Sequence, residues 1–168
     1  MSDRAESFAA GPLAAQASEQ QLAGRCADAM YQRDRASQHL GMQVDEIGPG
    51  RAVLSMPVTE TMIQGHDSCH GGYIFMLADS AFAFACNTYN EATVAAGCSI
   101  DYVAPGKLGD VLTAEAREQT RKGRTGVYDV RVSNERDELV ALFRGKSYKV
   151  RGPVIHEGES EPPSEKPL

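Results

Sequence analysis

The most hydrophobic segment of the chain, residues 73–86, predicts a single buried helix. It contains neither Pro nor Gly, and its side chains are apolar on nearly all sides. This pattern is typical of a helix covered all round rather than one lying on a surface. The segment is too short to cross a bilayer, which takes about 20 apolar residues. Gly71 and Gly72 precede it, so the backbone can turn sharply into the helix.

Alternating apolar and polar positions on both sides of this helix predict six strands. Residues 41–47 and 51–56 flank a Gly-Pro-Gly turn. In the second strand the inward positions are Ala52, Leu54 and Met56. The next three strands are indicated by the alternating apolar residues Val94, Ala96, Cys98, Ile100 and Tyr102, then Leu112, Ala114 and Ala116, and then Tyr128, Val130 and Val132. The last strand is expected at residues 139–150. Strands joined by short turns pair antiparallel. The pattern therefore predicts an α+β domain in which a sheet of five to six strands wraps around one long helix.

An extra helix is predicted near the N-terminus, where Ser18 and Gln21 have the spacing of a capping box. Its face toward the domain is expected to carry Leu22, Cys26, Ala29 and Met30. We expect one domain at residues 18–150, which is long enough to bury a proper core. The flanking residues 1–17 and 151–168 have little periodic apolar content, so we expect disordered tails there.

Charge and cysteine content narrow the class of protein. A net charge of −6 argues against a general nucleic-acid binder, because binding to phosphate backbones draws on clustered Lys and Arg. The four cysteines form no CxxC pair and no dense framework, which favours reduced thiols. The N-terminus has no basic region followed by an apolar core and a cleavage site. We therefore expect a cytoplasmic protein without a nucleic-acid or membrane partner.

Asp79 is the one charged residue inside the predicted central helix. A carboxylate there is costly unless it has a partner, so it either hydrogen-bonds to a neighbouring loop or helix cap, or it is catalytic. The first N–H groups of the helix, at Gly71, would stabilise a polarised carbonyl oxygen. Gly71 and Asp79 are eight residues apart, or about 12 Å along a helix. One carbonyl group can use both only if two such helices lie antiparallel in a dimer, brought close by Ala78, Ala81, Ala83 and Ala85.

The polar loop before the helix carries potential metal ligands and a thiol. His66, Cys69 and His70 are zinc-ligand types, but they lack a His-Glu-x-x-His helix and a fixed partner elsewhere, so we expect no metal. Cys69 is an alternative nucleophile, although no oriented His–acid pair is visible and a packed thiol is more common. His70 is expected to orient the loop or contact the substrate rather than act as a base.

Several motifs together resemble the PaaI-type (phenylacetic-acid-degradation) acyl-CoA thioesterases of the hotdog-fold superfamily, over about residues 20–150. They are Gly65-His66, Cys69-His70-Gly71-Gly72, Phe75, Leu77-Ala78-Asp79, Ala81-Phe82, Ser99-Ile100-Asp101-Tyr102, Pro105-Gly106, Gly109-Asp110, Thr125-Gly126-Val127-Tyr128-Asp129 and Ala141-Leu142-Phe143-Arg144-Gly145-Lys146-Ser147. The resemblance implies hydrolysis of an acyl-CoA, such as phenylacetyl-CoA or hydroxyphenylacetyl-CoA, to the free acid and coenzyme A. It implies no separate cofactor, because coenzyme A is part of the substrate. The residues predict a homodimer, and the resemblance implies a homotetramer.

The resemblance also implies roles for single residues. The Gly71 N–H would form the oxyanion hole, and Asp79 of the partner subunit would act as nucleophile or as general base for water. Gln64 stands where relatives commonly have an Asn that places the carbonyl or the water. His70 and Gly72 would contact the thioester.

The cationic residues of the second half cluster around one hairpin and the last strand. Lys122 and Arg124 flank Gly123, and Lys146 follows on the final strand. Without the resemblance, these residues are expected to form an ordinary solvent-exposed hairpin. With the resemblance, these three side chains become candidates for holding the phosphates of coenzyme A.

Two other functions stay open at this point. A hotdog hydratase or dehydratase would use His70 with Asp79 to move protons on the acyl chain. A non-catalytic acyl-CoA sensor would bind the same ligand without needing Asp79.

Overall fold

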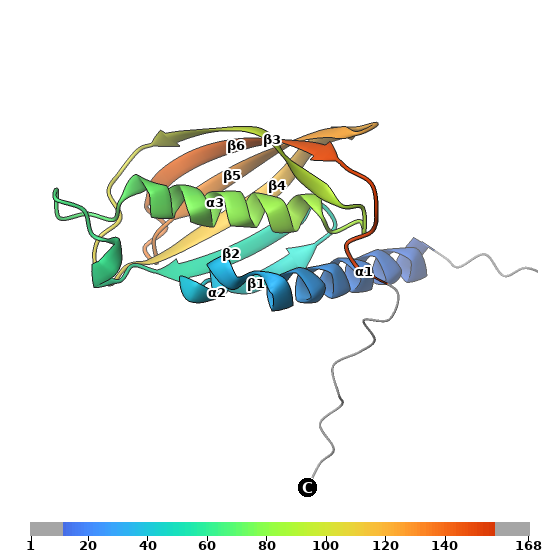
Figure 1. Ribbon diagram of the computed structural model, residues 1–168, viewed down its shortest axis with the longest axis horizontal. Coiled ribbons are helices and arrows are strands. Elements are labelled where there is room, and N and C mark those ends of the chain that lie inside the picture. Colours follow the sequence, from blue (N-terminus) through green and yellow to red (C-terminus); the bar gives the residue numbers. More distant parts are fainter. Residues whose placement is uncertain (1–11, 157–168) are drawn as a thin grey trace, which may run out of the picture.

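A computed structural model describes residues 12–156 and contains one antiparallel sheet of six strands curled around a central helix (Figure 1). The elements, in chain order, are α1 (Pro12–Arg33), α2 (Arg35–His39), β1 (Gln43–Gly48), β2 (Arg51–Pro57), η1 (Glu60–Met62), α3 (Gly71–Cys86), β3 (Thr93–Tyr102), β4 (Val111–Lys122), β5 (Thr125–Ser133) and β6 (Leu139–Lys149). The strand order is β1-β2-β4-β5-β6-β3. The α+β hotdog arrangement expected from the sequence is confirmed. Within residues 12–156, no helix is both long and apolar enough to span a membrane.

The core lies between α3 and the concave face of the sheet. From the helix, Leu77, Ala78, Ala81 and Ala85 have no exposed surface at all. The predicted inward positions of β2, β4 and β5 are also buried: Ala52, Leu54, Met56, Leu112, Ala114, Ala116, Tyr128, Val130 and Val132. Burying such side chains is the main favourable contribution to folding, at about 1.5–3 kcal/mol for each large one. The binary pattern of the sequence thus identified the parts of the core that β2, β4 and β5 supply.

The prediction that α3 is covered on all sides is wrong for a single chain. Met76, Asp79 and Ala83 follow one another at helical spacing and are only partly buried, because the curled sheet leaves one stripe of the helix uncovered. Of the four alanines expected to admit a partner helix, Ala78, Ala81 and Ala85 face the sheet of their own chain instead. Ala83 alone lies on the open stripe.

Strand β3 is an edge strand that pairs only with β6. A register shift between Ala95 and Gly97 marks a bulge, which turns the residues before it to the opposite face. Val94 therefore lies opposite the exposed Tyr148, on the outer face, and not in line with Cys98 and Ile100 as the alternation predicted. Such an exposed, unpaired strand edge is a surface on which another strand can pair.

Helix α1 begins at Pro12, so the prediction of a capping box at Ser18 is wrong. Proline suits the first position of a helix because its missing N–H would have no partner there. The buried residues of α1 are Ala23, Cys26 and Ala27, which shifts the packed stripe by about one residue from the expected one. In Figure 1 the helix runs alongside β1, on the outside of the domain as predicted.

Residues 151–156 contact α1 and the loop after α3. The Asn90 side chain accepts hydrogen bonds from the N–H groups of Val154 and Ile155, and Arg33 donates to the Val154 carbonyl. Val154 itself is buried. The remaining parts of the two predicted tails, residues 1–11 and 157–168, lie outside the described residues.

Candidate active site

The start of α3 is held in place by backbone pairing and by a side-chain cap. The His70 N–H donates to the Met62 carbonyl, and the Cys69 N–H donates to the Gly106 carbonyl, both at 2.8 Å. The His70 ring caps the helix, since its Nδ1 accepts the Gly72 N–H at 2.9 Å. A neutral imidazole that accepts at Nδ1 carries its proton on Nε2 and keeps no free lone pair to act as a base. His70 thus orients the helix start.

Gly71 is the first residue of the helix, and its N–H has no hydrogen-bond acceptor within residues 12–156. The adjacent Gly72 N–H is already engaged by His70, so Gly71 provides the free donor. The Gly71 carbonyl accepts the Tyr102 hydroxyl at 2.8 Å. A Cβ atom at Gly71 would come within 2.9 Å of the Tyr102 ring, so a larger residue there would force the ring or the helix start to move.

A hollow of about 460 Å³ opens beside this donor. Its wall includes Gln64, Ser68, Cys69, Gly71, Ile74, Tyr102, Val103, Ala104 and Pro105. Gln64 lies in the loop before α3, and its Nε2 donates to the Ser68 hydroxyl at 3.2 Å. The structure therefore brings together the predicted site residues Gln64, His70, Gly71 and Gly72. Tyr102 is a site residue that the sequence did not indicate, because its contact with Gly71 joins positions 31 residues apart.

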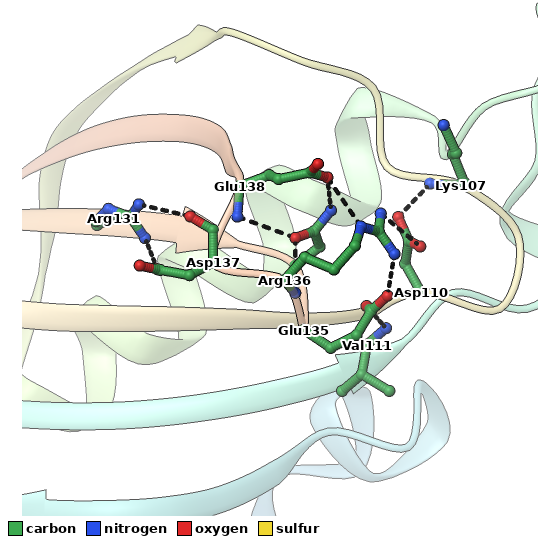
Figure 2. Close-up of polar contacts among 9 residues, drawn as sticks. Lys107, Asp110, Val111, Arg131, Glu135, Arg136, Asp137 and Glu138 are labelled. Carbon is green, nitrogen blue, oxygen red and sulfur yellow. Dashed lines mark hydrogen bonds and ion pairs between the residues drawn. The ribbon is translucent and has the colours of Figure 1, made fainter.

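The far wall of the hollow is tied to the turn between β5 and β6. Asp110 is buried and accepts the Lys107 N–H at 2.9 Å, and Arg136 from the turn lies 3.6 Å from the same carboxylate. Figure 2 shows this contact, together with the neighbouring pair of Arg131 and Asp137. The network holds the end of the connection between β3 and β4, at Lys107 and Asp110, which follows the lining residues Val103 to Pro105.

Asp79 lies on the open stripe of α3, in the middle of the helix. Burial raises the pKa of its carboxyl group above the ordinary value, and a contact with Cys98 counteracts part of this rise. The Cys98 thiol of β3 lies 3.6 Å from Asp79 Oδ1 and donates to it. None of the described residues supplies a cation that offsets this charge. Asp79 is thus a half-buried carboxylate that faces outward, with free lone pairs for chemistry.

Gly71 and Asp79 cannot act on one carbonyl group within one chain. Both belong to the same straight helix, eight residues apart, which separates them by about 12 Å. No loop movement can shorten this distance. Either the two groups have separate tasks, or each site combines Gly71 of one chain with Asp79 of another.

Cys69 is unsuited to be the nucleophile. It is buried, and burial raises the pKa of its thiol to about 11, so the thiolate is scarce at neutral pH. Throughout the described part of the chain, no group of three or more His, Cys, Asp or Glu side chains could hold a metal ion. His66 is exposed in the loop before α3.

The cationic candidates lie away from Gly71. Arg124 and Gly123 line a small hollow together with Cys86, the last residue of α3, and a 16-residue helix spans about 24 Å. The Arg124 guanidinium lies 5.2 Å from the Tyr148 ring, and its Nε donates to the Lys149 carbonyl. Lys122 is exposed in the same hairpin. Lys146 is exposed on the outer face of β6.

Comparisons with known proteins identify the family of this chain. Residues 66–141 match the family model described as Thioesterase superfamily. Acyl-coenzyme A thioesterase PaaI of Escherichia coli (strain K12) is 47% identical over 131 residues, which are 78% of this chain and 94% of the relative. The solved structure of E. coli PaaI, from the phenylacetic acid degradation operon, superposes with a TM-score of 0.79 at 46% identity, over 80% of this chain and 97% of that one.

A more distant structure also has the fold. A Streptococcus mutans UA159 protein solved bound to acetyl CoA has a TM-score of 0.64 at 26% identity, over 66% of this chain and 90% of that one. E. coli PaaI, by contrast, is matched over 94% of its length at 47% identity. The chain belongs to the PaaI-type acyl-CoA thioesterases of the thioesterase superfamily.

Proposed function

We propose that this protein is an acyl-CoA thioesterase, which hydrolyses a thioester to a carboxylic acid and coenzyme A. The observation that carries the proposal is the Gly71 N–H at the positive end of α3, which has no acceptor among the described residues and lies beside a hollow large enough for an acyl group. A donor in that position stabilises the oxyanion that forms when the thioester carbonyl is attacked.

The second half of the site would come from a partner subunit. Two chains related by a two-fold axis, with their α3 helices antiparallel, would bring Asp79 of one chain toward Gly71 of the other. The uncovered stripe of α3 and the unpaired edge of β3 are the surfaces that such a dimer would cover. The partner's Asp79 would then attack the carbonyl carbon itself or activate a water molecule.

The remaining residues of the hollow have supporting roles. The Gln64 amide would position the carbonyl or the water, with one more methylene than the Asn common in relatives. His70 would hold the helix start, since its Nδ1 is engaged by Gly72. Gly72 is exposed and has no side chain, so it would leave room for the thioester. A hydratase mechanism, which needs an imidazole base, finds no support in this His70 geometry.

The similar proteins also suggest the acyl group of the substrate, the oligomeric state and the cell compartment. We infer an aromatic acyl group such as phenylacetyl or hydroxyphenylacetyl, because the similar E. coli structure comes from a phenylacetic acid degradation operon. No cofactor besides the coenzyme A of the substrate is needed for this chemistry. We also propose that the protein is a homotetramer in the cytoplasm, without nucleic-acid or membrane partners. All four cysteines are free thiols, which suits a reducing compartment.

Release of free coenzyme A tests the function directly. We expect wild-type protein to release thiol from phenylacetyl-CoA and hydroxyphenylacetyl-CoA with a higher kcat/KM than from acetyl-CoA, measured with a thiol-reactive dye. Binding of acyl-CoA in calorimetry without any thiol release would instead favour a sensor. Hydration of an enoyl-CoA without thiol release would favour a hydratase.

Coenzyme A would be held by the β4–β5 hairpin of the partner, since antiparallel helices place that hairpin near Gly71. We expect Lys122→Gln combined with Arg124→Gln to raise KM about three- to tenfold, because exposed charge contacts are each worth up to about 1 kcal/mol. The kcat should stay close to that of wild type, since neither side chain touches the reacting carbonyl. Arg25→Gln, which removes an exposed positive charge on α1, is the matched control. An unchanged KM in the double variant would remove the hairpin from the coenzyme A site.

A further inference from the structure

The Asp79 carboxylate has one side-chain hydrogen-bond donor in the described part of the chain, and it is a thiol. Cys98 Sγ lies 3.6 Å from Asp79 Oδ1, a normal separation when the donor is sulfur. The two residues are 19 positions apart and come from different elements, α3 and β3. Neither the general-base role nor the nucleophile role of Asp79 explains why a cysteine lies there.

The β3 bulge is what directs this thiol toward the helix. Without the register shift between Ala95 and Gly97, Cys98 would share a face with Val94, which points outward opposite Tyr148. With the shift, Cys98 lies opposite Gly145, on the concave side of β6. Bulges of this kind commonly re-aim a side chain beside an active site.

The thiol keeps its proton and therefore acts as a donor. Burial and then the neighbouring Asp79 charge raise the pKa of Cys98 to about 11. The other titratable group that interacts with Asp79 is Cys86 of α3, whose pKa is also raised, to about 12. On β6, Arg144 is turned outward and pairs with Asp129, and Lys146 is exposed on the same outer face. Among residues 12–156, Asp79 thus faces one S–H donor and no cation.

We propose that Cys98 is a positioning residue for the thioesterase reaction, whose S–H group holds Asp79 Oδ1 and leaves Oδ2 directed at the substrate or water. This inference rests on the role proposed above for Asp79. A donor to the ionised carboxylate also favours the reactive, deprotonated form, and it opposes the effect of burial. The carboxylate is then both oriented and kept ionised at neutral pH.

The pH profile of kcat/KM for phenylacetyl-CoA tests this proposal in Cys98→Ala, Cys98→Ser and Ser99→Ala. In Cys98→Ala we expect the acid limb to move up by about half a pH unit, because a weak S–H hydrogen bond to the carboxylate is lost. Below that limb the activity should fall about threefold. Cys98→Ser keeps a donor and should have its limb at or below that of wild type. Ser99→Ala alters the next residue, on the outer face, and should match wild type.

A second measurement separates this proposal from the proposed function. The Asp79 pKa can be followed by ¹³C NMR of labelled carboxyl groups in wild type and in Cys98→Ala, with no substrate present. A higher pKa in Cys98→Ala supports the contact, and equal values overturn it, as does a Cys98→Ser profile that matches Cys98→Ala. If Asp79→Asn is fully active, the role proposed for Asp79 fails instead, whatever the NMR result.

Discussion

Asp79→Asn should hydrolyse phenylacetyl-CoA at least about a hundredfold more slowly than wild type, with the loss in kcat. The amide has nearly the same shape as the carboxylate but is neither a nucleophile nor a base, and such groups contribute about 10²–10⁴-fold. Steady-state thiol release at saturating substrate measures the effect. Because burial raises the Asp79 pKa above its ordinary value, wild-type activity should decline as the pH falls through this raised pKa, where the carboxylate becomes protonated.

This loss should not reflect unfolding. Asp79 is half-buried and has no cationic partner in the described part of the chain. Removing its charge therefore relieves a desolvation cost and should leave the Tm equal or higher. Asp101→Asn makes the same change at an exposed position of β3 and should stay within about twofold of wild type. Circular dichroism and size-exclusion chromatography check fold and assembly. If Asp79→Asn retains more than about a tenth of the wild-type kcat, Asp79 does not carry the chemistry.

Gly71→Ala should lower kcat by about a hundredfold, although it keeps the proposed oxyanion donor. Its methyl group would come within 2.9 Å of the Tyr102 ring, so the start of α3 or the ring must move. A shift of about 1 Å at a reacting group can cost a hundredfold. Thiol release by the purified variant measures the loss.

A pair of double variants separates the donor from the clash. In Gly71→Ala/Tyr102→Ala the methyl group has room and the N–H remains, so activity should return to the level of Tyr102→Ala alone. Gly71→Pro/Tyr102→Ala has room but no N–H, and should stay about 10²–10³-fold lower. Proline is compatible with this position, because His70 has the extended φ of −61° and ψ of 132° that suits a residue before proline. Equal activity of the two double variants would rule out the Gly71 N–H as the oxyanion donor.

Most of the fold could be predicted because local apolar periodicity reports burial. The predicted helix at residues 73–86 differs from α3 by two residues at its start, and the inward positions of β2, β4 and β5 are correct. What could not be predicted is where β3 lies. Its place beside β6 depends on contacts between residues about 40 or more positions apart, such as Cys98 opposite Gly145. Local patterns carry no information about such pairing.

In the candidate site, too, features of the local sequence could be predicted and contacts between distant residues could not. Gly71 and Asp79 were identifiable because glycine before an apolar helix and a carboxylate inside it are locally unusual. Their partners were not, since Tyr102 is 31 residues from Gly71 and Cys98 is 19 residues from Asp79. The contact of Cys98 with Asp79 further depends on a one-residue bulge in β3. The alternation of apolar and polar residues does not predict this bulge. Pro12, by contrast, was a visible signal for the start of α1.

The placement of Gly71 and Asp79 on one rigid helix has a consequence for inheritance. If each site combines Gly71 of one chain with Asp79 of the other, a chain lacking either group is inactive by itself. Two defective alleles of the gene, one altered at each position, would nevertheless complement each other, because a mixed dimer contains one site built from two intact halves. With random pairing of equal amounts, half of the dimers are mixed, so about a quarter of the wild-type sites would be intact.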